Sequence, residues 1–328
     1  MPNSITHYLF AMDCLDNLQI KSVKDIISKN MDLYILGCQG PNFFTYYSYM
    51  PIISKNNIGN MSELIHRRNI NIFLKRMLSY STNNSYIKHI FDDSNFHEIT
   101  MSYIYGFLSH YILDRSMHPY IYSLQFNLRD QYKLKSPRLL HKSIETHIDS
   151  LLLNKFKNLK PSQFNKHTDI NLSKDELIII CDMYKFLLKS VFNKSILYDD
   201  VIKCIETFKK TEQLLNSRGN FYSRFYLLMK KRLSKNSYID GKIYAEHKYC
   251  VNDLLNENKN TWENPFDNTK SSCSLLEIYD NSIGSYLKLI ETLDLYLSNK
   301  KSMIELLLEF NDRSFLTDQD WNIKYINI

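Results

Sequence analysis

Apolar residues recur at spacings of three and four along nearly the whole chain, which is the period of an α-helix and not of a β-strand. Glycine and proline, which punctuate short strands and tight turns, number only seven each among 328 residues. Together these features predict an all-α fold, a multi-helix bundle. The expected helices span 5–17, 21–36, 61–80, 97–118, 138–155, 173–191, 196–216, 220–233, 239–256, 274–297 and 301–309.

The charge is mildly basic, with a formal net charge of +6 and a pI near 8.7. Such an excess favours anionic partners, such as a phosphate ester, a membrane surface or a nucleic acid. The basic residues form no block as long as a nucleic-acid-binding tail, and the run 230–232 is typical of a solvated helix face. We therefore expect no stable nucleic-acid complex. The sequence does not indicate an oligomeric state.

The sequence lacks recognisable signals for export, membrane insertion or thiol chemistry. The six cysteines are scattered, and no pair has the C-x-x-C spacing of a thiolate zinc site or a redox motif. The N-terminus lacks the basic and then apolar pattern of a signal peptide, and no apolar stretch is long enough to span a membrane. These features predict a cytoplasmic protein with reduced thiols and no transmembrane segment.

One expected helix carries a stripe of possible metal ligands. Gly106, His110, Asp114 and His118 follow one another at intervals of four, so they share one face of the helix. Pro119 comes directly after the last histidine, and we expect the helix to end there. Eight of the ten histidines lie in the first 150 residues, so the chemistry is expected mainly in that half.

The length of this stripe constrains the kind of metal site. The rise of an α-helix separates His110 from His118 by about 12 Å, whereas donors to one zinc ion lie only about 2 Å from it. The two histidines are therefore expected to bind different metals, with Asp114 between them as a bridging ligand. A polar stripe on a surface helix is the alternative, since an exposed Asp–His pair needs no metal.

Other candidate ligands are individually weak. His141 and Glu145 form a second pair at a spacing of four, suited to zinc, although a helical ion pair has the same spacing. His66 and His7 do not indicate a metal site on their own. The segment 36–42 is a tight turn after a helix, because its glycines and Pro41 favour turns.

Taken together, these segments resemble the zinc-dependent phospholipase C family and, more distantly, the zinc-dependent single-strand nucleases. The resemblance is best over residues 1–155, and a weaker similarity surrounds residues 255–279. The matching segments are Met1-Pro-Asn-Ser-Ile-Thr-His7, Leu36-Gly-Cys-Gln-Gly-Pro-Asn42, His66, His110-x-x-x-Asp114-x-x-x-His118-Pro119 and His141-x-x-x-Glu145.

The resemblance implies an all-helical fold with up to three zinc ions in a cleft between helices. It implies a metal-binding helical core at 1–160 and a C-terminal helical region at 161–328 packed on it, as one structural domain overall. A third zinc would use His7, bridging Asp114 and, after loss of Met1, the terminal nitrogen of Pro2. The implied ligands of the first two ions are His66, His110 and Asp114, and then His118, His141 and Glu145.

Position 42 departs from the family pattern, which has an aspartate there as a ligand of the first zinc and a candidate base. Asn42 offers a neutral carbonyl oxygen but accepts no proton at neutral pH. Weaker metal binding is expected at this position, and a catalytic role for Asn42 as a base is in doubt. Zinc alone can lower the pKa of bound water to about 7, so a strong base is not essential.

The function implied by the resemblance is zinc-dependent hydrolysis of a phosphodiester such as a phospholipid, in which a metal-bound hydroxide attacks phosphorus and Asp114 holds the metals. A nuclease or another phosphodiesterase on the same scaffold would use the same metal chemistry. A catalytically weakened metal-binding protein is a second alternative, because of Asn42. A carboxylate that replaces the missing one, such as Asp13, would count against this alternative. A helical interaction module without metal is a third.

Overall fold

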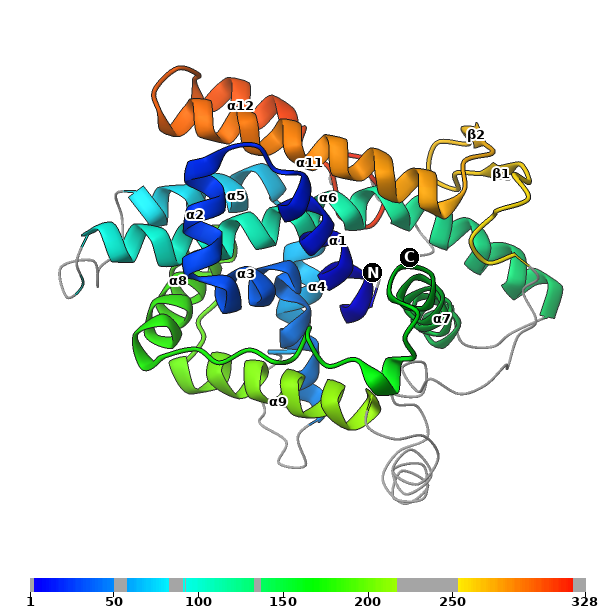
Figure 1. The fold of residues 1–328 in the computed structure, drawn as a ribbon, viewed down its shortest axis with the longest axis horizontal. Helices are drawn as coiled ribbons and strands as arrows, with labels where there is room; N and C mark the ends of the chain where they lie inside the picture. The colour runs from blue at the N-terminus through cyan, green and yellow to red at the C-terminus, as the bar shows by residue number, and fades with distance from the viewer. Residues whose placement is uncertain are drawn as a thin grey trace.

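Helices dominate the computed structural model, which describes residues 3–49, 58–82, 91, 93–132, 137–216 and 253–320 and confirms the all-α expectation (Figure 1). One two-stranded antiparallel sheet pairs Trp262 with Ser271. The expected helix at 220–233 lies outside the described residues, as does most of the one at 239–256. The described end of the latter, 253–256, is not helical. The described elements are α1 Ser4–Asn17, α2 Lys21–Lys29, α3 Met31–Cys38, η1 Gly40–Tyr49, α4 Asn60–Arg67, α5 Ile70–Thr82, α6 Asp93–Tyr132, α7 Pro137–Lys157, η3 Pro161–Gln163, α8 Lys174–Phe192, α9 Tyr198–Asn216, β1 Trp262–Glu263, β2 Lys270–Ser271, α11 Leu275–Leu297 and α12 Met303–Phe310.

Two expected helices are each divided in two, and an asparagine lies at both breaks. The segment 21–36 breaks at Asn30, whose φ of −126° leaves the helical region. The segment 61–80 breaks at Asn69, which adopts a left-handed φ of 56°. Asparagine tolerates the left-handed conformation of Asn69 better than most residues that have a Cβ. Apolar periodicity does not indicate where such a break will fall.

The expectation that Pro119 ends its helix was wrong, because α6 continues through the proline to Tyr132. A proline inside a helix removes one hydrogen bond and costs about 3 kcal/mol locally. Tertiary contacts beyond the proline offset this cost. Ile121 is fully buried, and the Tyr120 hydroxyl donates a 3.0 Å hydrogen bond to the Leu254 carbonyl.

Helix α6 is the central element, about 60 Å long at the rise of an α-helix, and it crosses the whole molecule in Figure 1. Helix α3 crosses α6 where two glycines meet. A Cβ on Gly106 would lie 2.2 Å from the Tyr34 carbonyl oxygen, and one on Gly37 would lie 2.2 Å from that of Tyr103. The backbones therefore approach more closely than any side chain allows.

The C-terminal helices pack on this N-terminal framework. Helix α11 lies along α6, where the Tyr286 hydroxyl donates to the Tyr105 carbonyl at 3.2 Å. Helix α9 packs on η1, and buried Glu212 accepts hydrogen bonds from Ser4 and Tyr46. Contacts of this kind join the two parts of the chain, whereas the boundary near residue 160 stays a prediction.

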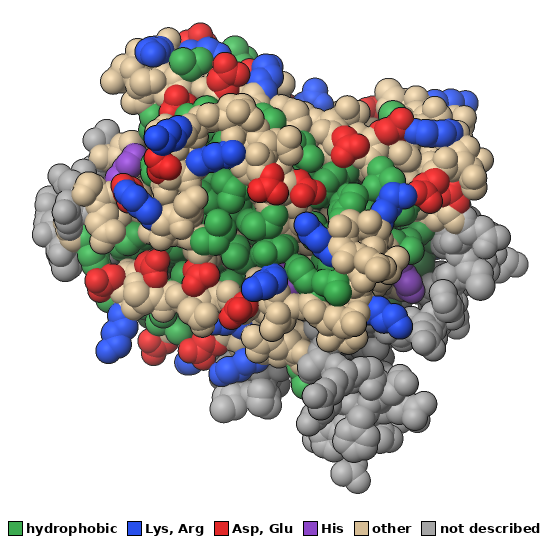
Figure 2. Space-filling view, viewed as in Figure 1, with side chains coloured by type: hydrophobic (Ala, Val, Ile, Leu, Met, Phe, Trp, Pro, Cys, Tyr) green, Lys and Arg blue, Asp and Glu red, His purple; other side chains and the backbone are tan. Residues whose placement is uncertain are grey.

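The surface carries mixed charge. On the face shown in Figure 2, acidic and basic side chains are interspersed around an apolar centre, and neither sign forms a continuous patch. The net positive charge is therefore not concentrated on this face. Among the described helices, none combines the length and the apolar character that crossing a bilayer requires.

Candidate metal centre

The histidine and aspartate stripe of α6 points into the protein interior. His110, Asp114 and His118 are all fully buried, which is incompatible with a polar stripe on a surface helix. The arrangement follows from the periodicity of the helix, since residues four apart lie on one face, and α1, α3 and α7 all pack against α6.

Three histidines from three helices surround the Asp114 carboxylate. His7 Nε2 lies 3.2 Å from Oδ1, on one side. On the other side, Oδ2 lies 3.2 Å from His110 Nε2 and 3.5 Å from His66 Nε2. We refer to these four residues as the Asp114 group. The two Asp114 oxygens lie nearest to different histidine nitrogens, and the His7 and His110 rings stack with their centroids 4.1 Å apart. His7, His110 and Asp114 are close enough together to hold a metal ion.

A second cluster, the Glu145 group, consists of His118, His141 and Glu145. Glu145 Oε1 lies 2.9 Å from His141 Nε2 and 3.9 Å from His118 Nε2. The other carboxylate oxygen, Oε2, accepts a 3.0 Å hydrogen bond from Lys142, which is also buried. His110 and His118 thus lie in different groups, each of which could hold a metal ion.

Four of these histidines have the same hydrogen-bonding arrangement. In each, Nδ1 lies against an oxygen that can only accept, so Nδ1 can donate its proton there while Nε2 is directed at a carboxylate of the two groups. The Nε2 atoms of His66 and His110 also lie 3.2 Å from each other. A metal-binding histidine typically donates its other ring N–H in this way. The Nδ1 contacts are His66 to Ser62 O at 2.6 Å, His110 to Cys38 O at 3.3 Å, His118 to Phe315 O at 2.8 Å and His141 to Gln125 Oε1 at 2.6 Å.

The polar atoms of the two groups fit a metal. In the described part of the chain, both oxygens of Asp114, both ring nitrogens of His7 and Nε2 of His118 are buried without a hydrogen-bond partner. A buried carboxylate left in this state is strongly unfavourable unless a cation is bound to it. Donors 2 Å from a tetrahedral zinc lie about 3.3 Å apart, close to the 2.9–3.9 Å separations measured here.

At neutral pH the histidines of the two groups are in the protonation state that metal binding requires. Burial lowers the pKa of the five histidines in the two groups, and that of His110 falls to about 4, so they are neutral and free to ligate. Burial alone would raise the pKa of Asp114, whereas positive charge on the adjacent His110 and His118 lowers it well below its usual range. Burial lowers the pKa of Lys142 to about 8.

The start of the chain is anchored beside the Glu145 group. Asp149 of α7 accepts hydrogen bonds from the backbone N–H groups of Ile5 and Thr6, at 3.2 and 3.0 Å, and so holds the first turn of α1. The Asn3 amide lies 3.4 Å from the Thr146 hydroxyl. Pro2, the expected terminal ligand, lies outside the described residues.

Asn42 lies in η1, two residues after Gly40, the glycine that contacts the His110 ring. Gly40 has a φ of 55°, and a Cβ there would lie 2.2 Å from His110 Cδ2. The Asn42 side-chain oxygen is buried and has no hydrogen-bond partner among the described residues. Asp13 belongs to neither group, and its Oδ2 accepts a 2.6 Å hydrogen bond from Tyr279 of α11.

An all-helical protein with two buried groups of histidine and carboxylate ligands belongs to the class of proteins that can hold several metal ions. Comparison with known families agrees. The model of the zinc dependent phospholipase C family matches residues 6–194, more than half of the chain, so the chain belongs to this family. No curated protein and no solved structure gives a match.

Several polar and aromatic residues around the centre were not identified from the sequence. Lys142 and Asp149 share a face of α7 with Glu145, and their spacing could have suggested this. Gln125 and Phe315 gave no signal, because they reach the histidines through tertiary packing.

Proposed function

We propose that the protein is a zinc-dependent phosphodiester hydrolase that resembles phospholipase C. The observation that supports this most directly is the convergence of imidazole Nε2 atoms on the buried Asp114 and Glu145 carboxylates. A zinc-dependent family implies hydrolase chemistry, and the buried groups provide donors of the type that zinc prefers.

The proposed ligands follow the distances within the two groups. His66, His110 and Asp114 Oδ2 would hold one zinc, with Asn42 as a neutral further donor. His118, His141 and Glu145 would hold a second. His7 and Asp114 Oδ1 would hold a third, and Pro2 would complete it in a chain that has lost Met1.

Zinc at these positions would supply Lewis-acid charge for phosphate oxygens and an acidified water molecule. The chain's own residues keep five imidazoles neutral and hold Asp114 ionised between them. Their ring orientations are set by the Nδ1 hydrogen bonds, so that little rearrangement accompanies metal binding.

The balance of charge favours an anionic substrate. The proposed ligands include two carboxylates, Asp114 and Glu145, against up to three dications, so the loaded centre would retain positive charge. A phosphodiester anion is complementary to such a centre, and family membership favours a phospholipid as its source.

A catalytically weakened metal-binding protein is the second candidate, and Asn42 favours it. An amide at this position adds no negative charge and accepts no proton. Its buried oxygen without a partner could donate to a metal, but it provides no base.

Metal analysis tests the proposal first. Protein purified without chelators is expected to contain about three zinc ions, and chelation should lower its melting temperature, because a ligand that binds only the folded state stabilises it. Absence of metal, together with an unchanged melting temperature after chelation, would exclude the metal site.

Parallel activity assays then separate the candidates. We would compare a choline phosphodiester, phospholipid vesicles and single-stranded nucleic acid as substrates, using wild type and Asn42→Asp. Hydrolysis of the phospholipid by wild type supports the proposal, and preference for nucleic acid supports a nuclease. Activity confined to Asn42→Asp would identify the native chain as a weakened relative.

A further inference from the structure

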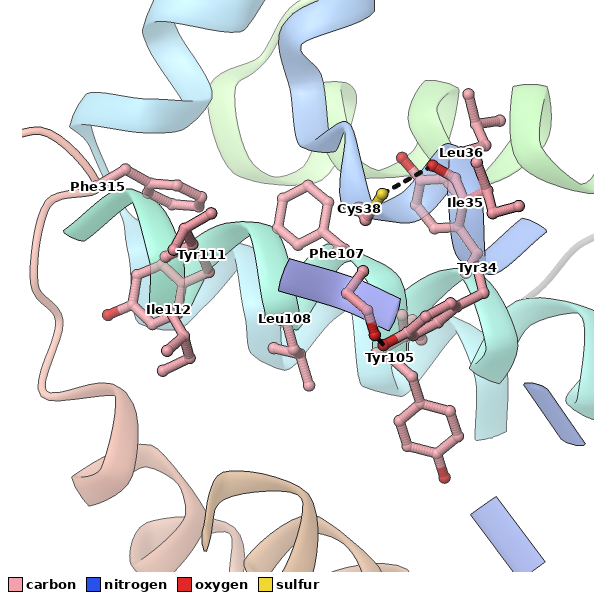
Figure 3. Close-up of a cluster of buried hydrophobic side chains, with 14 of the residues drawn as sticks. Tyr34, Ile35, Leu36, Cys38, Tyr105, Phe107, Leu108, Tyr111, Ile112 and Phe315 are labelled. Carbon is pink, nitrogen blue, oxygen red and sulfur yellow. Dashed lines mark hydrogen bonds between the residues drawn. The ribbon is translucent and has the colours of Figure 1, made fainter. Parts of the chain in front are cut away.

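The segment after α12 returns to the buried histidines from the far end of the chain. Phe315 is 1% exposed, and its ring centroid lies 5.0 Å from that of His66 and 5.9 Å from that of His110. Figure 3 shows Phe315 beside Tyr111 of α6, and their centroids are 4.7 Å apart. The ring thus fills the space next to the Asp114 group.

The backbone of the same residue contacts both groups. The carbonyl oxygen of Phe315 accepts the Nδ1 proton of His118 at 2.8 Å. Its N–H donates to the His66 carbonyl at 3.2 Å, and the Ser314 hydroxyl donates to the same carbonyl at 3.3 Å. One short stretch of chain therefore touches a histidine of the Asp114 group and a histidine of the Glu145 group.

Further contacts hold this stretch in place. The Tyr111 hydroxyl donates to the Arg313 carbonyl at 3.2 Å, and the Arg313 side chain donates to the Asp318 carbonyl at 3.0 Å. The Ser314 N–H donates to the Gln319 carbonyl at 2.9 Å. These contacts fix the position of the Phe315 carbonyl. A carbonyl can select a histidine tautomer only if it is held in such a fixed position.

We propose that residues 313–318 form a positioning segment for the metal centre. The Phe315 carbonyl, together with the Asp114 carbonyl 2.9 Å from the same Nδ1, selects the His118 tautomer with an unprotonated Nε2. The Phe315 ring holds the imidazoles of His66 and His110 in orientation. The segment lies outside the matched residues 6–194, so membership of the family does not assign this role. The inference rests on the proposed zinc site.

Two matched variants test the role of the ring. Phe315→Ala should lower zinc affinity about 10- to 100-fold, the range typical for loss of an outer-shell partner, in a titration against a chromophoric chelator. Phe310→Ala is the control, because Phe310 is equally buried and packs on Tyr111 but forms no ring contact with a histidine in the described part of the chain. It should lower the melting temperature to a similar extent and change zinc affinity less than about threefold.

A measurement on the unaltered protein covers the case in which Phe315→Ala fails to fold. Long-range ¹H–¹⁵N NMR of the metal-free wild type should show His118 and His66 protonated at Nδ1 alone. A proton on Nε2 of His118, unchanged zinc affinity in Phe315→Ala, or an equal loss in Phe310→Ala would overturn the inference. Failure of the wild type to bind zinc would instead refute the proposed function.

Discussion

At the scale of single residues, Gly40 shows how closely the backbone fits the candidate ligands. Its left-handed φ of 55° suits glycine, and its Cα lies against the His110 ring. Gly40→Ala is expected to destabilise the metal-free protein by about 1–2 kcal/mol from backbone strain alone, and by more from the contact with His110. Urea denaturation and zinc titration would measure both effects.

A second variant at this position separates strain from contact. Asparagine tolerates the left-handed region but carries the same Cβ, so Gly40→Asn should lose zinc affinity as Gly40→Ala does. Recovery of wild-type affinity in Gly40→Asn would show that strain, rather than the His110 contact, governs the site.

Lys142 is a buried cation held 3.0 Å from Glu145 Oε2, which leaves Oε1 to face the histidines. Lys142→Met is expected to cost about 3–5 kcal/mol and to weaken zinc binding at the Glu145 group, because it leaves a buried carboxylate oxygen without its cation. Lys155→Met on the same helix removes a half-exposed pair with Glu257 and should cost at most about 1 kcal/mol. Equal losses of zinc affinity in the two variants would contradict this role.

At the scale of secondary-structure elements, the crossing of α3 and α6 positions the Asp114 group. The two helices meet at Gly37 and Gly106, and η1 follows α3 directly, so the close crossing presses Gly40 onto His110. Gly106 lies one turn before His110 on the same stripe, and its role is therefore to allow the approach that brings η1 to the ligands.

Gly106→Ala should force these helices apart and destabilise the metal-free protein by about 1–3 kcal/mol, despite the better helix propensity of alanine. Gly284→Ala in α11 is the matched control. A Cβ at Gly284 meets no atom within 4 Å, so this variant should be stabilised by about 0.5–1 kcal/mol. Urea denaturation would measure both changes in unfolding free energy. A Gly106→Ala variant as stable as wild type would show that the crossing of α3 and α6 tolerates a side chain.

At the scale of the whole molecule, the fold concentrates five neutral histidines in its interior, and this makes the metal-free protein sensitive to acid. Each has a folded-state pKa below the unfolded value of about 6.5, so below that pH the unfolded chain binds more protons. Stability is complete above about pH 6.5 and is lost as the pH falls toward about 4, the pKa of His110.

The expected loss is about 1.4 kcal/mol per pH unit for each such histidine, measured as the fall in unfolding free energy of chelated protein between pH 7 and 5. His110→Gln should flatten this dependence. His147→Gln, at a half-buried histidine outside both groups, should leave it as in wild type. An unchanged slope in His110→Gln would show that another group controls acid unfolding.

The sequence alone determined the helical class and the stripe of His110, Asp114 and His118, because helix periodicity and ligand spacing are local properties. It did not determine the break at Asn69 or the continuation of α6 through Pro119, where conformational tolerance and tertiary packing override local preference. It also gave no sign of Phe315, which meets His118 across 197 positions of sequence. Tertiary structure alone decides such contacts, since the acceptor that selects a histidine tautomer comes from wherever the folded chain brings a carbonyl close.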